Sequence, residues 1–238
     1  MMDEHEELVN SYVQNGNGFK FFKRRKSGKP FHFKNTFKPI KHIKNISRGL
    51  TDLRKKKGEN HILDEHIEAA KRSKDAYLHP DERTGKGYVR HLSNDEIAVY
   101  HNNGKTDVSI RGTKSKDDIK TDLYLASGNL KKSARYQRNK AHLDKVRKVL
   151  GPINELSGHS LGSSLALALG DEHKKSKVVA FNPGAGITGS YGKKKGTIYS
   201  SDGDTVSALN MLSSKHDIRI VPSGSDDILG RHSIDNFQ

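Results

Sequence analysis

One serine of this 238-residue chain stands where its hydroxyl could act as a nucleophile. Ser160 is the centre of the stretch 158–162, Gly-His-Ser-Leu-Gly, which follows a short predicted strand and opens a run of small residues. In a strand–turn–helix of this kind the turn lifts the serine above the sheet edge, and the glycines leave room for neighbouring backbone. The pattern predicts an acyl-transfer nucleophile, with the Leu161 N–H as a donor to the developing oxyanion. A Gly/Ser-rich loop that only caps a helix is the alternative.

A serine hydroxyl needs a base, and the order expected for such a turn is serine, then acid, then histidine. His232 lies in a predicted loop beyond the last predicted strand, whereas His216 begins that strand, at its wrong end. We therefore expect His232 to take the proton of Ser160. Asp204 follows another predicted strand at its carboxyl end, where α/β sheets assemble sites, and we expect it to fix the histidine tautomer. Asp202 in the same turn is the rival acid.

A second oxyanion donor is expected from a loop earlier in the chain. The triplet Arg111-Gly112-Thr113 directly follows a predicted strand, and Thr113 offers both a backbone N–H and a hydroxyl. We predict that Thr113 and Leu161 form the oxyanion hole. The alternative for the triplet is a strand-end turn with an ion-paired arginine.

The elements that must position these residues can be read from hydrophobic periodicity and from turn and capping residues. Three short strands are predicted first as a β-meander, with a hairpin turn at Asn102-Asn103-Gly104, and strands then alternate with helices. The predicted helices cover residues 62–78, 117–125, 133–150 and 161–173. The predicted strands cover residues 88–92, 97–101, 106–110, 153–157, 177–181, 197–201 and 216–221. This order indicates an α/β fold, a mostly parallel central sheet flanked by helices.

Positive charge is concentrated before this predicted domain. The chain carries a net charge of +15, and residues 1–60 hold 15 Lys and Arg against 6 Asp and Glu. We predict two parts: a basic, flexible N-terminal arm over residues 1–60 and a folded domain over residues 61–238. Between residues 19 and 57 the basic clusters alternate with phenylalanines, a pattern suited to nucleic-acid phosphates or to an anionic membrane surface. A solvated tail is the third interpretation.

Several classes of function find no support in the sequence. There is no cysteine, hence no disulfide, thiolate nucleophile or sulfur-based zinc site. We find no motif for a metal, a phosphate loop or a dinucleotide, so no cofactor is expected. The acidic start and the lack of an 18-residue apolar run favour neither a signal peptide nor a transmembrane helix. We expect an intracellular or membrane-peripheral protein.

Over residues 61–238 the chain resembles the class 3 lipase family of α/β hydrolases. The resemblance is carried, in chain order, by Ser109-Ile110-Arg111-Gly112-Thr113, Asp118-Ile119, Asp122-Leu123, Gly158-His159-Ser160-Leu161-Gly162, Phe181-Asn182-Pro183, Asp204-Thr205-Val206 and His232. It implies an α/β-hydrolase fold, a Ser160–Asp204–His232 triad, an oxyanion hydroxyl on Thr113 and a bracing carboxylate on Asp122. The strand before Ser160, with Asn154 and Glu155, is polar for a central parallel strand.

The sequence thus predicts a serine ester hydrolase that acts on lipid esters through an acyl-enzyme, a lipase- or phospholipase-type carboxylesterase. The rival hypothesis is a scaffold protein with a hydrolase-like fold whose basic arm binds nucleic acid or membrane. Thioesterase, acyltransferase and peptidase activities also stay open, because the same triad serves all of these acyl transfers.

Overall fold

The structure is a computed structural model of the whole chain, and it describes residues 61–115, 118, 121–122, 124–125, 128–184, 195–204, 216–225 and 227–238. All of these residues belong to one compact unit, Ile46–Gln238. The predicted basic arm, residues 1–60, lies outside the described residues, so its binding role stays a prediction.

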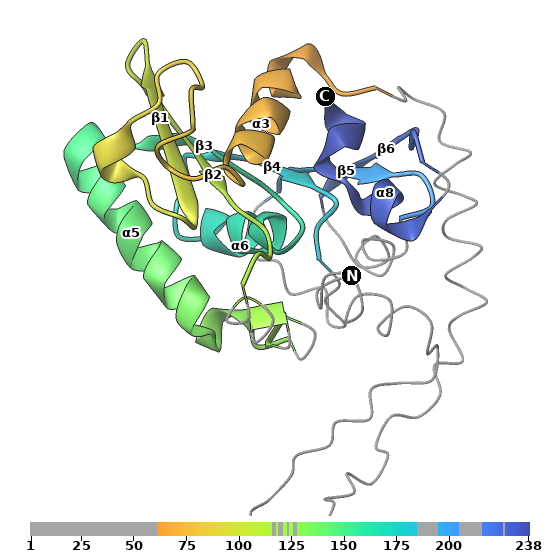
Figure 1. Cartoon of the computed structure of the whole chain (residues 1–238). Helices are drawn as coiled ribbons and strands as arrows, with labels where there is room; N and C mark the ends of the chain where they lie inside the picture. The colour runs from red at the N-terminus through yellow and green to blue at the C-terminus, as the bar shows by residue number, and fades with distance from the viewer. Residues whose placement is uncertain are drawn as a thin grey trace, which may run out of the picture. The chain divides into compact units, whose positions relative to one another are not determined.

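A six-stranded sheet forms the centre of the described unit (Figure 1). Its strands follow one another across the sheet in chain order: β1 (Ile97–Asn102), β2 (Lys105–Ile110), β3 (Ile153–His159), β4 (Lys177–Phe181), β5 (Thr197–Ser201) and β6 (Asp217–Val221). β1 pairs with β2 antiparallel, and every later pair is parallel. The predicted α/β architecture with a mostly parallel sheet is therefore confirmed.

The predicted hairpin is present, but the predicted three-strand meander is wrong. Asn103 and Gly104 join β1 to β2 with φ of 50° and 72°, as a two-residue hairpin turn requires. The segment predicted as a strand over residues 88–92 makes only one bridge, Tyr88 to Tyr100, and then forms a 3-10 helix over Arg90–Leu92. The Ser93 hydroxyl donates to the Val89 carbonyl and accepts from the Val99 N–H, which turns the chain away from the sheet.

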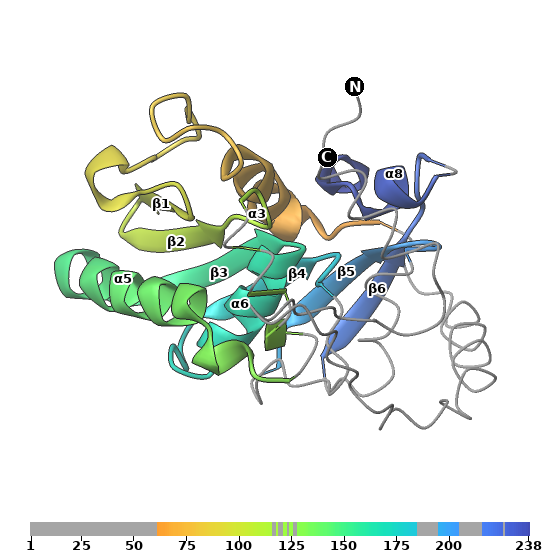
Figure 2. The ribbon, with the colours of Figure 1, turned by 60° about the horizontal axis from the view of Figure 1, so that its bottom comes forward.

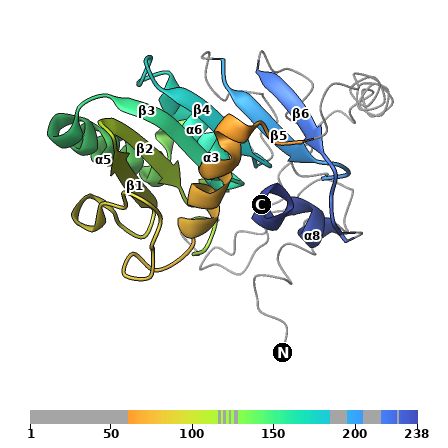
Figure 3. The same cartoon turned by 90° about the horizontal axis from the view of Figure 1, so that it is seen from above.

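Helices cover both faces of the sheet. α5 (Ala134–Leu150) and α6 (Leu161–Gly170) lie on one face, and α3 (Asp64–Asp75) lies on the other (Figures 2 and 3). Ser133 caps the start of α5, where its hydroxyl accepts from the Tyr136 N–H, and Gly151, with φ of 83°, caps its end. The predicted helix over residues 117–125 falls only partly within the described residues. Among the described helices, none combines the length and apolar character needed to cross a bilayer.

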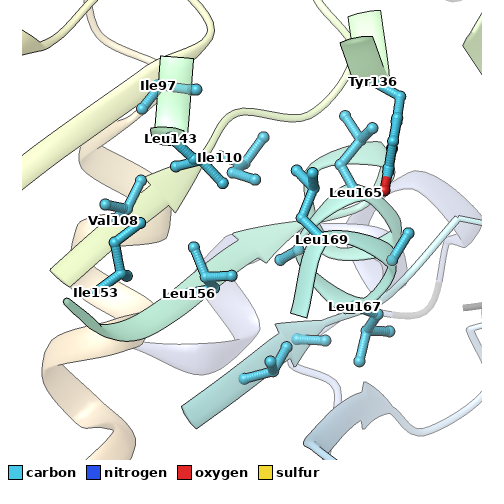
Figure 4. Packing of buried hydrophobic residues seen from close by; sticks show 14 of the residues in the cluster. Ile97, Val108, Ile110, Tyr136, Leu143, Ile153, Leu156, Leu165, Leu167 and Leu169 are labelled. Carbon is cyan, nitrogen blue, oxygen red and sulfur yellow. The ribbon is translucent and has the colours of Figure 1, made fainter. Parts of the chain in front are cut away.

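Alternation along the strands divides the core into two clusters, because successive side chains point to opposite faces. Leu156, Val178 and Ala180 pack toward α5 and α6, in the cluster that Figure 4 shows around Leu143, Leu165 and Ile110. The intervening residues of the later strands pack toward α3 and the C-terminus, in a cluster of Ala69, Ala70, Val179, Phe181, Tyr199, Val221 and Phe237. Each fully buried leucine or phenylalanine contributes on the order of 2 kcal/mol to folding.

The two polar residues noted in the first half of β3, Asn154 and Glu155, have partners that explain them. Glu155 is buried on the α3 side, where its Oε1 accepts from the Arg72 guanidinium at 2.7 Å. The Asn154 amide donates to Asp107 on the neighbouring strand at 3.0 Å. Burial raises the pKa of Glu155, and the charge of Arg72 opposes that shift. A central strand can therefore carry a carboxylate here because α3 delivers an arginine to it.

Candidate active site

Ser160 lies at the sharp turn between β3 and α6. Its backbone has φ of 54° and ψ of −126°, a conformation that side-chain-bearing residues adopt only when their surroundings enforce it. A side chain at Gly158 would stand 2.6 Å from the Gly162 carbonyl carbon, and one at Gly162 would collide with the Ile110 carbonyl oxygen. Both glycines are therefore needed for β3, α6 and β2 to approach one another.

Hydrogen bonds from β4 hold this turn in place. The Ser160 N–H donates to the Phe181 carbonyl at 3.0 Å. The buried Ser163 hydroxyl donates to the Gly158 carbonyl at 2.5 Å and accepts from the Phe181 N–H at 2.8 Å. These bonds tie the strained turn at Ser160 to both β3 and β4.

The structure brings Ser160, His232 and Asp204 together. The Ser160 Oγ lies 2.9 Å from Nε2 of His232, and Nδ1 of His232 lies 3.0 Å from Oδ2 of Asp204. The Asp204 side chain is fully buried, whereas that of His232 is 17% exposed. Because the carboxylate only accepts, the proton of a neutral His232 lies on Nδ1, and Nε2 accepts from the serine hydroxyl. This is the arrangement in which a histidine can withdraw a proton from serine.

His232 is not in a loop, as the sequence suggested, but ends the short helix α8 (Ile228–His232). The Asp227 carboxylate caps this helix by accepting from the Gly230 N–H at 2.7 Å. The Asn236 amide then donates to the carbonyls of Gly230 and Arg231 from the 3-10 helix Ile234–Phe237. Phe237 packs on Phe181 with ring centroids 5.2 Å apart, which holds the C-terminus on the sheet.

Of the two candidate acids, Asp204 contacts the histidine. It follows Gly203, whose φ of 76° turns the chain sharply after β5. The Asp202 N–H donates instead to the Val221 carbonyl of β6. His216, the rejected candidate base, accepts from the Gly196 N–H at 3.1 Å, before the start of β5. It is thus bound at the amino end of the strands, opposite the edge where Ser160 lies.

Thr113 and Leu161 lie beside the nucleophile turn. Leu161 is the first residue of α6, directly after Ser160. A side chain at Gly112, next to Thr113, would stand 2.8 Å from the His159 carbonyl, so this loop lies against the turn. The Thr113 hydroxyl donates to the Asp122 carboxylate at 2.9 Å. Burial raises the pKa of Asp122 to about 7, and the Asp118 charge adds to that shift.

Two residues, Asp118 and Asn182, support the site although the sequence alone assigned them no role. Asp118 is buried between Arg111 and Arg135, and its Oδ2 accepts from the N–H groups of Lys114 and Ser115 at 2.9 Å. It therefore shapes the loop that carries Thr113. The available signal for Asp118 was a charged residue beyond the end of a predicted strand, but its ion pair with the distant Arg135 was not predictable.

Asn182 is the second such residue. It has φ of 42°, and its amide donates to the Ser201 hydroxyl and to the Arg231 carbonyl, both at 3.1 Å. Its Oδ1 accepts from the Ser201 N–H at 2.8 Å. One side chain thus joins β5, which leads to Asp204, with α8, which carries His232.

Within the described part of the chain, no three His, Cys, Asp or Glu side chains form a group that could hold a metal ion. No protein-family model matches the chain, and no curated protein matches it significantly. The arguments for a function therefore come from the geometry of the site.

Proposed function

We propose that this protein is a serine ester hydrolase, with Ser160 as nucleophile, His232 as general base and acid, and Asp204 as the group that orients and stabilises His232. The observation that carries the proposal is the continuous hydrogen-bond chain from the Ser160 hydroxyl through His232 to the buried Asp204. These hydrogen bonds lie at the carboxyl ends of the parallel strands, where such folds assemble their sites.

In acylation, the Ser160 oxygen attacks the ester carbonyl carbon while Nε2 of His232 accepts the hydroxyl proton. The oxyanion that forms receives hydrogen bonds from the Leu161 N–H and from Thr113. Collapse of the tetrahedral intermediate breaks the bond to the leaving alcohol, which takes the proton from His232. Water then attacks the acyl-enzyme with His232 as base, releasing the acid and restoring the Ser160 hydroxyl.

Lipid esters are the proposed substrates, and this assignment comes from the resemblance to class 3 lipases. A chain with a net charge of +15 suits an anionic phospholipid surface better than a neutral one. The basic residues between 19 and 57 that would provide part of this attraction lie outside the described residues.

The test is covalent labelling by a fluorophosphonate together with hydrolysis of short- and long-chain nitrophenyl esters by the full chain. Both should occur in the wild type and be lost in Ser160→Ala. Ser157→Ala is the matched control, because Ser157 is buried on β3, the strand that leads to Ser160, and its hydroxyl has no hydrogen-bond partner among the described residues. A wild type that neither labels nor hydrolyses would overturn the proposal, and salt-sensitive nucleic-acid binding by that protein would favour a scaffold.

A further inference from the structure

His159, the residue before the nucleophile, is buried between a tyrosine and the candidate catalytic histidine. Its Nδ1 lies 2.9 Å from the Tyr77 hydroxyl, and its Nε2 lies 2.6 Å from the main-chain carbonyl oxygen of His232. The rings of His159 and His232 have centroids 5.2 Å apart. Neither His159 nor Tyr77 has a role in the acyl-transfer steps above.

The partners of His159 fix its proton. The His232 carbonyl oxygen can only accept, so Nε2 of His159 must carry a hydrogen and donate it. Burial, together with the nearby His232, lowers the pKa of His159 to about 3, while the hydrogen bond to the His232 carbonyl and the charges of Asp204 and Asp235 oppose the shift. The ring is therefore neutral at physiological pH, and its Nδ1 is an acceptor that receives the Tyr77 hydroxyl proton.

Tyr77 extends the chain of contacts to the oxyanion loop. Its oxygen lies where a side chain at Gly112 would be, so the phenol packs against the backbone of this loop. Lys114, one residue beyond Thr113, donates from Nζ to the Tyr77 carbonyl at 3.1 Å. Burial raises the pKa of the Tyr77 phenol, so this group stays a neutral donor. The contacts thus run from Gly112 through Tyr77 and His159 to the main chain of His232.

We propose that Tyr77 and His159 are positioning residues that hold the main chain of His232 in register with the oxyanion loop, and that the buried His159, with Nδ1 facing the Tyr77 hydroxyl, stays uncharged while His232 becomes an imidazolium. The proposal rests on the proposed hydrolase function. The second role follows from proximity, since two positive imidazoles at this separation would repel each other. The first role follows from the direct contacts that join the oxyanion loop to the His232 main chain through Tyr77 and His159. A displacement of about 1 Å at a catalytic group can cost about 10²-fold in rate, so these contacts should matter for turnover.

The first arm of the test needs no turnover. In the full chain labelled with ¹⁵N-histidine, the His159 signals, assigned with His159→Gln, should show a bare Nδ1 and a protonated Nε2. That tautomer should persist below the ordinary histidine pKa of about 6.5. A wild-type His159 that carries its proton on Nδ1, or that titrates as an ordinary histidine, would overturn the inference.

The second arm measures kcat and KM for a soluble ester. Tyr77→Phe should lower kcat about tenfold, the effect of losing one hydrogen bond, with KM unchanged. Tyr199→Phe is the matched control, since it removes the same kind of bond, 2.9 Å from a tyrosine hydroxyl to Nδ1 of His66. His159→Gln, which keeps an N–H donor, should retain more kcat than His159→Leu at equal thermal stability.

The outcomes separate this inference from the proposed function. Equal kcat values for Tyr77→Phe and Tyr199→Phe, or for the Gln and Leu variants of His159, would contradict a positioning role. Ser160-dependent turnover in a protein whose His159 carries its proton on Nδ1 would overturn the positioning role of Tyr77 and His159 and leave the hydrolase function standing. A His159 with its proton on Nε2 in a protein without Ser160-dependent turnover would support the contacts of His159 with Tyr77 and His232 and would overturn the proposed hydrolase function.

Discussion

The Ser160 Oγ and Nε2 of His232 lie 2.9 Å apart although 72 residues separate them in the chain. Ser160 is delivered by β3 and α6, in the middle of the sheet, while His232 comes from α8, beyond the edge strand β6. The chain returns to the centre because Phe237 packs on Phe181 of β4 and Asn182 binds the Arg231 carbonyl. The contact therefore depends on the packing of the C-terminus against the sheet.

Replacing the buried acid tests whether His232 needs its partner. Asp204→Asn should lower kcat by about 10⁴-fold, because the amide can donate to Nδ1 and stabilise the tautomer that cannot accept the serine proton. Steady-state hydrolysis of a nitrophenyl ester measures this loss. Asp202→Asn, two residues away in the same turn, should keep kcat within about twofold of the wild type. Similar losses in both variants would contradict the assignment of Asp204.

The Thr113 hydroxyl can be tested apart from its backbone N–H. Thr113→Val keeps the shape and removes the hydroxyl, which donates to Asp122 in the free protein and must turn to the oxyanion during acylation. The kcat should fall about 10²-fold with a smaller change in KM, as for other oxyanion donors. Thr113→Ser should restore most of the rate. Thr106→Val is the control on β2, the strand before the Thr113 loop, since Thr106 is buried and its hydroxyl bonds to His101 and Leu150 instead. Full activity in Thr113→Val would remove the hydroxyl from the oxyanion hole.

Asp122 should make stability depend on pH in an unusual direction. Its pKa is raised to about 7 by burial, above the value of about 3.9 for an unfolded aspartate. Between these values the folded state binds the proton and the unfolded state does not, so the Asp122 contribution to stability falls as pH rises. The free energy of unfolding of Asp122→Asn should therefore increase relative to the wild type from about pH 4 to about pH 7, then level off.

Urea unfolding at about pH 5 and about pH 8 measures this difference. Asp81→Asn is the control, because Asp81 is exposed and its hydrogen bond with Arg90 lowers its pKa. Any contribution of Asp81 changes only below the unfolded value, so the control difference should be flat over this range. An equally flat difference for Asp122→Asn would contradict a protonated buried carboxyl.

The local parts of the site were predictable from sequence because their signals are local. Glycines two residues on either side of Ser160 and their place between a strand and a helix predict the turn, and Asn103-Gly104 predicts the hairpin. The order of strands and helices predicts a parallel sheet, whose carboxyl edge collects residues from distant segments. The turn and the hairpin depend on backbone geometry within a few residues, and the sheet on the order in which strands and helices alternate.

The unpredicted parts depend on partners far away in the chain. Tyr77 meets His159 across 82 residues, and Arg72 meets Glu155 across 83, contacts that exist only because α3 packs on β3. The strand predicted over residues 88–92 stops after Val89, because the Ser93 hydroxyl bonds the Val89 carbonyl and the Val99 N–H, although the Val89 N–H still donates to the Val99 carbonyl. No pattern within one segment reports such pairings, since they are decided by which helix covers which strand.

The close contact of β2 with the nucleophile turn leads to a stability prediction at Gly162. A methyl group there would collide with the Ile110 carbonyl oxygen and lie 2.8 Å from the Arg111 carbonyl carbon, and backbone cannot move aside as a flexible side chain can. Gly162→Ala should therefore cost about 3 kcal/mol or more in the free energy of unfolding. Any folded fraction should also label slowly with fluorophosphonate, because relieving the collision moves β2 and the Thr113 loop away from Ser160.

Gly104 in the β1–β2 hairpin separates this steric effect from the general cost of losing a glycine. It has φ of 72°, and apart from its neighbours in the chain no atom of the described residues lies within 4 Å of an added methyl group. Gly104→Ala should thus cost only the strain of a left-handed backbone, about 1–2 kcal/mol, and should label at the wild-type rate. Urea unfolding and labelling rates of the two variants measured side by side decide the matter. A Gly162→Ala protein as stable and as reactive as Gly104→Ala would show that β2 does not press on the turn.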